Sequence, residues 1–230
     1  MGRSSIYNKL FYPENLLKGG SKIGIVNLMY EKKEFLILVF SNLIVQLGIT
    51  YYVMEKIVIK GISIWLLFIA QLIIIFVISL VPMPEFVKFL IFCLFSYIFG
   101  LTLSNLKKSY SSSMINVAIQ GALTVFGLML ATGVALIVGG LNIDYKIGVF
   151  LFWSLLILII TRLIFVIGVK MDQANKILSF IGIILFAFYV MYDTNIILQR
   201  NYSGDFITAS MDYYLDIINL FTSFVSFSKN

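Results

Sequence analysis

Seven long apolar stretches follow one another along this chain of 230 residues, and they constrain its fold more than any other feature. They run over Phe35–Met54, Ile62–Val81, Phe86–Ser104, Ile115–Val138, Ile147–Val169, Ile177–Leu198 and Phe206–Phe227. Each holds about the 20 residues that an α-helix needs to cross a bilayer. Because 60% of the residues are hydrophobic and 12% are charged, one soluble core could not bury this surface. The sequence therefore predicts an all-α integral membrane protein, a bundle of seven transmembrane helices.

The rest of the chain divides into two short tails. Residues 1–34 are polar, residues 35–227 form the predicted transmembrane domain, and residues 228–230 form a short C-terminal tail. The first apolar run begins at Phe35, so the first span is expected to act as the signal anchor. Lysines crowd the tail just before it, at Lys18, Lys22, Lys32 and Lys33. By the positive-inside rule they favour a cytosolic Met1, whereas the lysines of the loops, such as Lys56, Lys107 and Lys170, lie on the opposite side and argue against it. An odd number of spans places Met1 and Asn230 on opposite sides.

Composition excludes several kinds of chemistry. The chain has no histidine and one cysteine, which removes Ser–His dyads, HExxH zinc sites, His-ligated haem and thiolate clusters. Cys93 lies within the third span and is expected to be an apolar filler. No glycine-rich phosphate loop is present, so no cofactor is expected. The net charge of +6 is spread without an aromatic-interleaved basic patch, so we expect the lipid bilayer, and not nucleic acid, as the partner.

The fourth span carries a stripe of small residues. Its members recur every four positions: Gly127, Ala131, Ala135 and Gly139. Such spacing lets membrane helices approach closely. It predicts that this helix packs tightly at the centre of the bundle, although chance in a Gly- and Ala-rich helix would give the same pattern.

Four charged residues lie inside the spans: Arg162, Asp193, Asp212 and Asp216. A charge at the centre of a bilayer costs at least about 2.5 kcal/mol, so each is a candidate for function. Arg162 and Asp212 lie near the ends of their spans, where they could equally reach headgroups or interfacial water. Asp193 and Asp216 lie deeper and are the main candidates.

Those two aspartates are predicted to face each other. If the chain turns near Tyr202–Asp205, Asp193 and Asp216 lie roughly 15 to 18 Å deep on two antiparallel neighbours. Two carboxylates this close in a low dielectric do not both ionise easily, so the pair should share a proton. Arg162 sits roughly 10 Å away in depth and is at most a distant counter-ion. With backbone carbonyls and water, the pair would make a sparse, weak calcium site, to which Thr194 and Asn219 could add oxygens. Both could equally serve as interhelical hydrogen bonders.

At these residues the chain also resembles a known family. Four strings carry the resemblance: FGLTLS at Phe99–Ser104, AIQGALTVFGLML at Ala118–Leu130, YVMYDTNIIL at Tyr189–Leu198 and YYLDIINLF at Tyr213–Phe221. Together they are similar to the Bax inhibitor-1 family, also called the transmembrane Bax inhibitor motif proteins.

The resemblance implies a seven-helix fold in which six spans surround the last, and a pH-sensitive calcium leak with Asp193 and Asp216 as a di-acidic sensor. It implies the endoplasmic reticulum or Golgi membrane in a eukaryotic or viral setting, and the plasma membrane in a bacterial one. Eukaryotic and viral relatives suppress cell death, with other membrane proteins of cell-death or calcium signalling as possible partners. One departure is in the second span, where relatives often carry a carboxylate and a basic residue. Here the chain has Gln71 and the turn Val81–Glu85.

Two other functions remain open from the sequence. Paired aspartates on adjacent spans also occur in intramembrane aspartyl proteases, whose first motif resembles Tyr192–Asp193. The second motif, Gly-x-Gly-Asp, fails, because Asp216 follows Tyr-Tyr-Leu. We therefore expect no enzyme. The third possibility is a non-conducting scaffold that acts through partner proteins.

Overall fold

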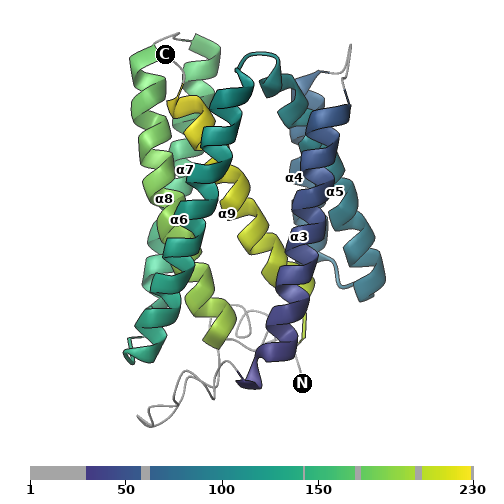
Figure 1. Cartoon of the computed structure of the whole chain (residues 1–230), viewed down its shortest axis with the longest axis vertical. Coiled ribbons are helices and arrows are strands. Elements are labelled where there is room, and N and C mark those ends of the chain that lie inside the picture. The colour runs from purple at the N-terminus through teal and green to yellow at the C-terminus, as the bar shows by residue number, and fades with distance from the viewer. Residues whose placement is uncertain (1–29, 58–62, 142, 169–171, 200–203, 229–230) are drawn as a thin grey trace, which may run out of the picture.

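The computed structural model describes residues 30–57, 63–141, 143–168, 172–199 and 204–228, and these residues form seven α-helices (Figure 1). The helices are α3 (Lys33–Lys56), α4 (Ile64–Leu80), α5 (Glu85–Lys107), α6 (Ser112–Val138), α7 (Tyr145–Gly168), α8 (Asp172–Gln199) and α9 (Phe206–Phe227). Each apolar stretch of the sequence corresponds to one helix, so the predicted all-α membrane fold is confirmed. The N-terminal tail up to residue 29 and Asn230 lie outside the described residues, and the sidedness of the two ends stays a prediction.

Length and apolar character identify five of these helices as able to cross a membrane: α3, α5, α6, α7 and α8. The helix α4 has 17 residues, which is at the lower end of the spanning range. The helix α9 has 22 residues, but its hydroxyl and carboxyl side chains make it too polar to stand among the five. A helix of that kind needs protein, not lipid, around it.

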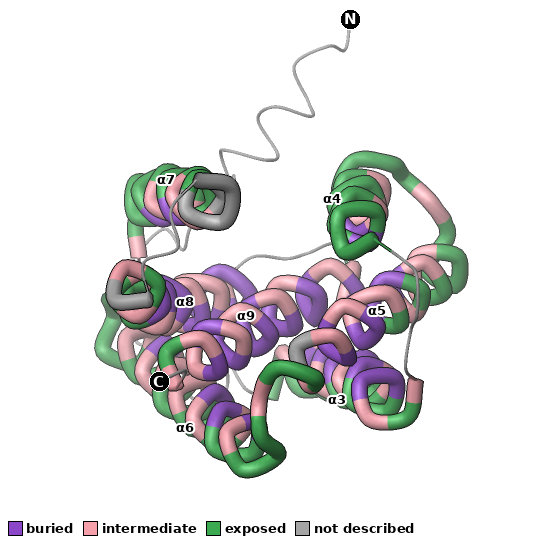
Figure 2. The backbone as a smooth tube through the Cα atoms, turned by 90° about the horizontal axis from the view of Figure 1, so that it is seen from above, coloured by how far each residue is buried: buried purple, intermediate pink, exposed green. Residues whose placement is uncertain are grey.

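The helix α9 occupies the centre of the bundle. Seen from above, it runs obliquely between α3 and α5 on one side and α6 and α8 on the other (Figure 2). Buried positions occur all round it, 13 of 22 residues in total, including the polar Ser210 and Asp216. The helices α4 and α7 lie further out, α4 along α5 and α7 along α8. The implied arrangement of six helices around the last is therefore realised as four close neighbours and two outer helices.

The predicted packing role of the small-residue stripe on α6 is wrong. All four of its members are exposed: Gly127, Ala131, Ala135 and Gly139. A Cβ added at Gly127 would meet no neighbouring atom within 4 Å. The close contact lies on another face, where a Cβ at Gly133 would come within 2.8 Å of the Thr194 Cβ atom on α8. Two faces of α6 carry small residues, and the buried one is marked by Ala118, Ala122 and Gly133.

Candidate functional site

The structure brings Asp193 and Asp216 together at the contact between α8 and α9. Asp216 is 3% exposed, and its carboxyl group is hydrogen-bonded to that of the half-buried Asp193. Among the described residues, Oδ2 of Asp216 has no hydrogen-bond partner. A buried carboxyl oxygen left without a donor is costly, and it marks a place where a proton, a cation or water would be favourable.

A third carboxyl group lies beside this pair. Asp212, half-buried and one turn before Asp216 on α9, is close enough to add its negative charge. Even so, no cluster of three or more His, Cys, Asp or Glu side chains in the described part of the chain is arranged to hold a metal ion. A cation here would take its remaining ligands from carbonyls, hydroxyls or water. That fits the weak calcium site predicted from the sequence better than a tight one.

A tyrosine and a threonine pack next to the acidic pair. The Tyr213 hydroxyl donates a hydrogen bond to Oγ1 of Thr194 at 3.1 Å. The Thr194 hydroxyl in turn donates to the Val190 carbonyl oxygen at 2.7 Å. Thr194 is thus engaged with α8 and α9 as an interhelical hydrogen bonder, one of its two predicted roles. Asn219, the other predicted oxygen ligand, is half-buried one turn beyond Asp216.

Arg162 reaches α9 from the outer helix α7. Its Nη2 atom donates a hydrogen bond to Oγ of Ser223 at 3.2 Å, close to the place where a Cβ at Gly182 of α8 would lie. Gly182 therefore leaves the gap through which the guanidinium passes. Ser223 is seven residues beyond Asp216, or about 10 Å along the helix. This agrees with the depth separation inferred from the sequence, and it makes Arg162 a tether to α9 more than a direct counter-ion.

The start of α9 is held to α5 by an ion pair. Gly204 has φ +84°, a conformation that favours glycine, and Asp205 caps α9 by accepting from the Thr208 N–H at 3.0 Å. Nζ of Lys88, at the start of α5, lies 2.5 Å from Oδ2 of Asp205. Burial alone would raise the pKa of Asp205, but the hydrogen bonds from Lys88 and Thr208 outweigh it and hold the pKa below its usual value.

A second buried polar cluster lies on the other side of α9, and the sequence reasoning missed it. We call it the amide–hydroxyl seam, and it consists of Asn42, Gln46, Thr50, Ser96, Ser210 and Tyr214, all buried. Gln46 is its centre. Its Nε2 atom donates to Oδ1 of Asn42 at 3.0 Å, and its Oε1 atom accepts from Oγ of Ser96 at 2.8 Å. The same amide approaches Sγ of Cys93 at 3.5 Å, so that cysteine has a polar neighbour.

The seam joins α3 to α9 at two levels. Asn42 Nδ2 donates to Oγ of Ser210 at 2.5 Å, and the hydroxyls of Thr50 and Tyr214 lie 2.5 Å apart. The available signal was the spacing of Asn42, Gln46 and Thr50, which recur every four residues within an apolar span and so share one helix face. Uncharged polar residues in a span can hydrogen-bond between helices, and here they do.

The fold and this site define a class: a multi-pass α-helical membrane protein built around a polar last helix with a buried acidic pair. A family model described as "Inhibitor of apoptosis-promoting Bax1" matches residues 32–230. The chain belongs to this Bax inhibitor family, which confirms the resemblance seen in the sequence.

Individual relatives support the assignment. The chain is 33% identical to Protein LIFEGUARD 1 of Arabidopsis thaliana, with 51% of this chain and 49% of the relative covered. It is 30% identical to Bax inhibitor 1 of Saccharomyces cerevisiae, with coverages of 56% and 48%. It is 36% identical to the Golgi anti-apoptotic protein of Vaccinia virus, with coverages of 33% and 32%. The matches thus span about half of the plant and yeast relatives and a third of the viral one. The names of the yeast and viral relatives describe inhibitors, not enzymes.

Proposed function

We propose that this chain is a pH-sensitive calcium leak in a cellular membrane, with Asp193 and Asp216 as its sensor and its weak calcium-binding group. The observation that carries the proposal is the buried contact between these two carboxyl groups, in which Oδ2 of Asp216 has no partner among the described residues. Membership of the Bax inhibitor family supports a role in suppressing cell death.

The pair supplies a physical basis for pH sensing. When Asp193 and Asp216 share one proton, a charge-assisted hydrogen bond joins α8 to α9 and closes the path. Loss of that proton at higher pH leaves two negative charges side by side in a low dielectric. Their repulsion, increased by Asp212, favours separation of the two helices. Raising the pH should therefore increase flux.

Calcium suits the separated pair as a passing ion. It prefers hard oxygen ligands and takes six to eight of them, of which two aspartates supply a minority. An incomplete ligand set binds weakly, and weak binding lets an ion leave as well as enter. The same ion could bridge Asp193 and Asp216 and bring the helices back together, so calcium would both permeate and limit its own flux.

A leak of this kind would suppress cell death by lowering the calcium stored in an organelle. The viral relative is named a Golgi anti-apoptotic protein. We therefore place this chain in the Golgi or endoplasmic reticulum membrane of a eukaryotic or virus-infected cell, or in the plasma membrane of a bacterium. Its partners would be calcium, protons, lipid and membrane proteins of cell-death or calcium signalling.

Purified protein in liposomes loaded with a calcium dye tests the proposal, assayed from about pH 6 to about pH 8. For one titrating unit the wild-type flux should change by up to about tenfold per pH unit. Asp193→Asn or Asp216→Asn should flatten that dependence, and the double variant should not add the two effects. Asp212→Asn is the matched control on the same helix, and it should change flux much less.

Two outcomes would contradict the proposal. If wild-type protein conducts no calcium in pure liposomes, the chain is a scaffold that acts through partners. If both single variants keep the wild-type pH profile, Asp193 and Asp216 are structural. Tyr214→Phe, on the other face of α9, should leave the pH profile unchanged, and this control separates damage to the bundle from loss of the sensor.

A further inference from the structure

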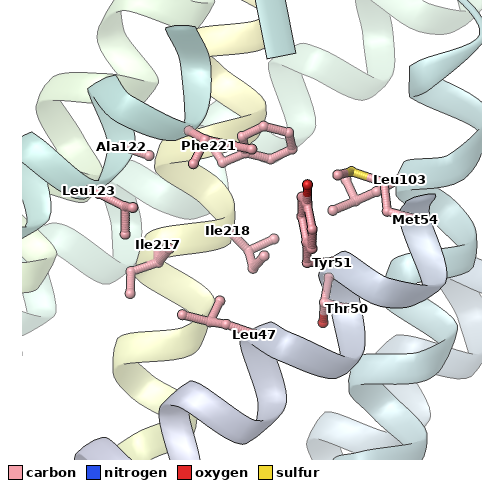
Figure 3. Close-up of a pocket in the computed structure, with 11 residues that line it drawn as sticks. Leu47, Thr50, Tyr51, Met54, Leu103, Ala122, Leu123, Ile217, Ile218 and Phe221 are labelled. Carbon is pink, nitrogen blue, oxygen red and sulfur yellow. The ribbon is translucent and has the colours of Figure 1, made fainter. Parts of the chain in front are cut away.

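An apolar cavity of about 150 Å³ opens between α3 and α6, and α9 forms its floor (Figure 3). Its walls include Leu47 and Met54 of α3, Leu123 of α6, and Ile217 and Phe221 of α9. In Figure 1, α3 and α6 stand apart, with α9 visible between them. Since α3 and α6 flank the opening, the cavity faces the membrane side of the bundle.

The depth of the cavity matches one leaflet of a bilayer. Met54 lies two residues before the end of α3 at Lys56, and Leu47 lies nine residues before it. At about 1.5 Å per residue, the cavity extends from about 3 Å to about 14 Å below that end of the helix. Half of a hydrocarbon core is about 15 Å thick. Tyr51 and Leu123, at the rim, are 55% and 50% exposed, which leaves the mouth open sideways.

A cavity with these walls takes an apolar occupant. An apolar cavity of about 150 Å³ lined by aliphatic and aromatic side chains stays dry and binds apolar ligands. Left empty, it would forfeit the dispersion contacts of every side chain around it. At this depth and with a sideways mouth, the neighbouring apolar molecules are the acyl chains of lipids.

The end of the bundle above the cavity is positively charged. Lys56 and Lys108 are exposed there, and Lys107 pairs with Glu55 at 2.5 Å. Three lysines against one glutamate leave a net charge of +2 among these four residues. At the same end, α6 is capped by Ser111 and begins with Ser112 and Ser113, and serine hydroxyls can donate hydrogen bonds to phosphate oxygens. Lys56 is nine residues from Leu47 and so lies on the opposite face of α3 from the cavity, whereas Lys108 lies in the connection from α5 to α6. Positive charge from Lys108 at this end of an apolar cavity is the arrangement that an anionic phospholipid complements.

We propose that the cavity between α3 and α6 binds one acyl chain of an anionic phospholipid, with the phosphate beside Lys108. The acyl chain lies against Ile217 of α9 and beside Thr50, whose hydroxyl contacts Tyr214 in the amide–hydroxyl seam. A bound chain therefore fills the space between α3, α6 and α9 on the face of α9 away from the acidic pair. This proposal does not depend on calcium conduction.

Native mass spectrometry of the full chain released from detergent tests it, with phosphatidylglycerol and phosphatidylcholine as probes. One retained phosphatidylglycerol per chain is expected, in preference to phosphatidylcholine. Leu123→Trp should block the mouth and reduce retention of both lipids. Leu128→Trp is the matched control, because Leu128 is an exposed leucine of the same helix outside the cavity wall. It should retain lipid as the wild type does.

Charge variants test the headgroup part without touching the cavity. Lys108→Gln should weaken retention of phosphatidylglycerol about fivefold, since a lysine near an anionic surface contributes about 1 kcal/mol. Lys56→Gln, on the opposite face of α3, is the control and should leave that retention unchanged. Retention of phosphatidylcholine should stay the same. Equal retention of the two lipids by the wild type, or full retention by Leu123→Trp, would overturn the proposal. So would a mass of two chains without lipid, because the face would then be an interface between copies.

Discussion

The two polar faces of α9 differ in how their buried groups are satisfied. Toward α3 and α5, Ser210 and Tyr214 join the amide–hydroxyl seam, in which neutral donors and acceptors meet at 2.5 to 3.1 Å. Toward α8, Asp216 meets another carboxyl group and keeps an oxygen without a partner among the described residues. The first face is complete as folded, and the second has a place where a proton, a cation or water would be favourable.

This difference separates structure from function within one helix. A network whose members all have partners fixes helix positions and gains nothing from a ligand. A buried carboxyl pair changes its energy whenever a proton leaves or a cation arrives. We therefore expect changes in the seam to alter stability, and changes in the acidic pair to alter the response to pH and calcium.

The largest stability effect is expected from Gln46→Leu. The change removes the partners of Asn42 and Ser96 at once, and each lost interhelical bond or orphaned group costs about 1 to 2 kcal/mol, so the total should be about 2 to 4 kcal/mol. Thermal unfolding in detergent measures this. The matched control is Gln71→Leu on the outer helix α4, where one bond to Thr102 at 2.7 Å is lost. Equal losses at the two sites would mean that the seam has no special role.

A smaller loss is expected from Gly133→Ala, which lies on the acidic side of the bundle. The added Cβ would come within 2.8 Å of Thr194 and 2.9 Å of the Met191 carbonyl oxygen, so overpacking should cost about 1 to 3 kcal/mol. Gly127→Ala, on the exposed stripe of the same helix, meets open space and should raise stability by up to about 1 kcal/mol through helix propensity. A lower melting temperature for Gly133→Ala and a higher one for Gly127→Ala would confirm which face of α6 is buried.

The smallest effect on stability is expected at Asp205, the N-cap residue of α9, which belongs to neither polar face. Because its pKa is lowered in the fold, its ion pair with Lys88 stabilises the protein above the unfolded pKa, near 4, and is lost as the pH falls further. A partly exposed pair of this kind contributes roughly 0 to 1 kcal/mol. Asp205→Asn keeps the helix cap and should remove that acid sensitivity in unfolding measured from about pH 6 to about pH 3. If the stability of the variant and of the wild type falls equally with pH, the ion pair contributes no acid sensitivity and the prediction is wrong.

The sequence predicted what short-range rules determine. Apolar length located every helix, and α9 has the predicted bounds Phe206–Phe227. The meeting of Asp193 and Asp216 followed from a short turn between antiparallel helices. The face of α6 could not be predicted in the same way, because Ala118 and Ala122 repeat with the same spacing as the exposed stripe. Choosing between the faces depends on where α8 and α9 lie.

The seam and the cavity were missed for a different reason. The sequence places Asn42, Gln46 and Thr50 on one helix face. Uncharged polar side chains cost less free energy in a span than carboxylates, so they are a weaker signal of a special site. Two of the partners of these three residues, Ser210 and Tyr214, lie more than 160 residues away in the chain. The cavity is made by the spacing of four helices, α3, α5, α6 and α9, which no local pattern encodes.

The hydrogen bond from Arg162 to Ser223 has a mechanical consequence for the outer helix α7. Much of α7 is exposed on the membrane side, and helices exposed to lipid tilt when the hydrocarbon thickness changes. Because the guanidinium passes over Gly182 to reach α9, α7 cannot tilt far without breaking this bond or displacing the tip of α9. Spin labels on α7 and α9 in bilayers of different chain length would report this coupling. A correlated change at the two labels would mean that one side chain couples the thickness of the surrounding membrane to the central helix.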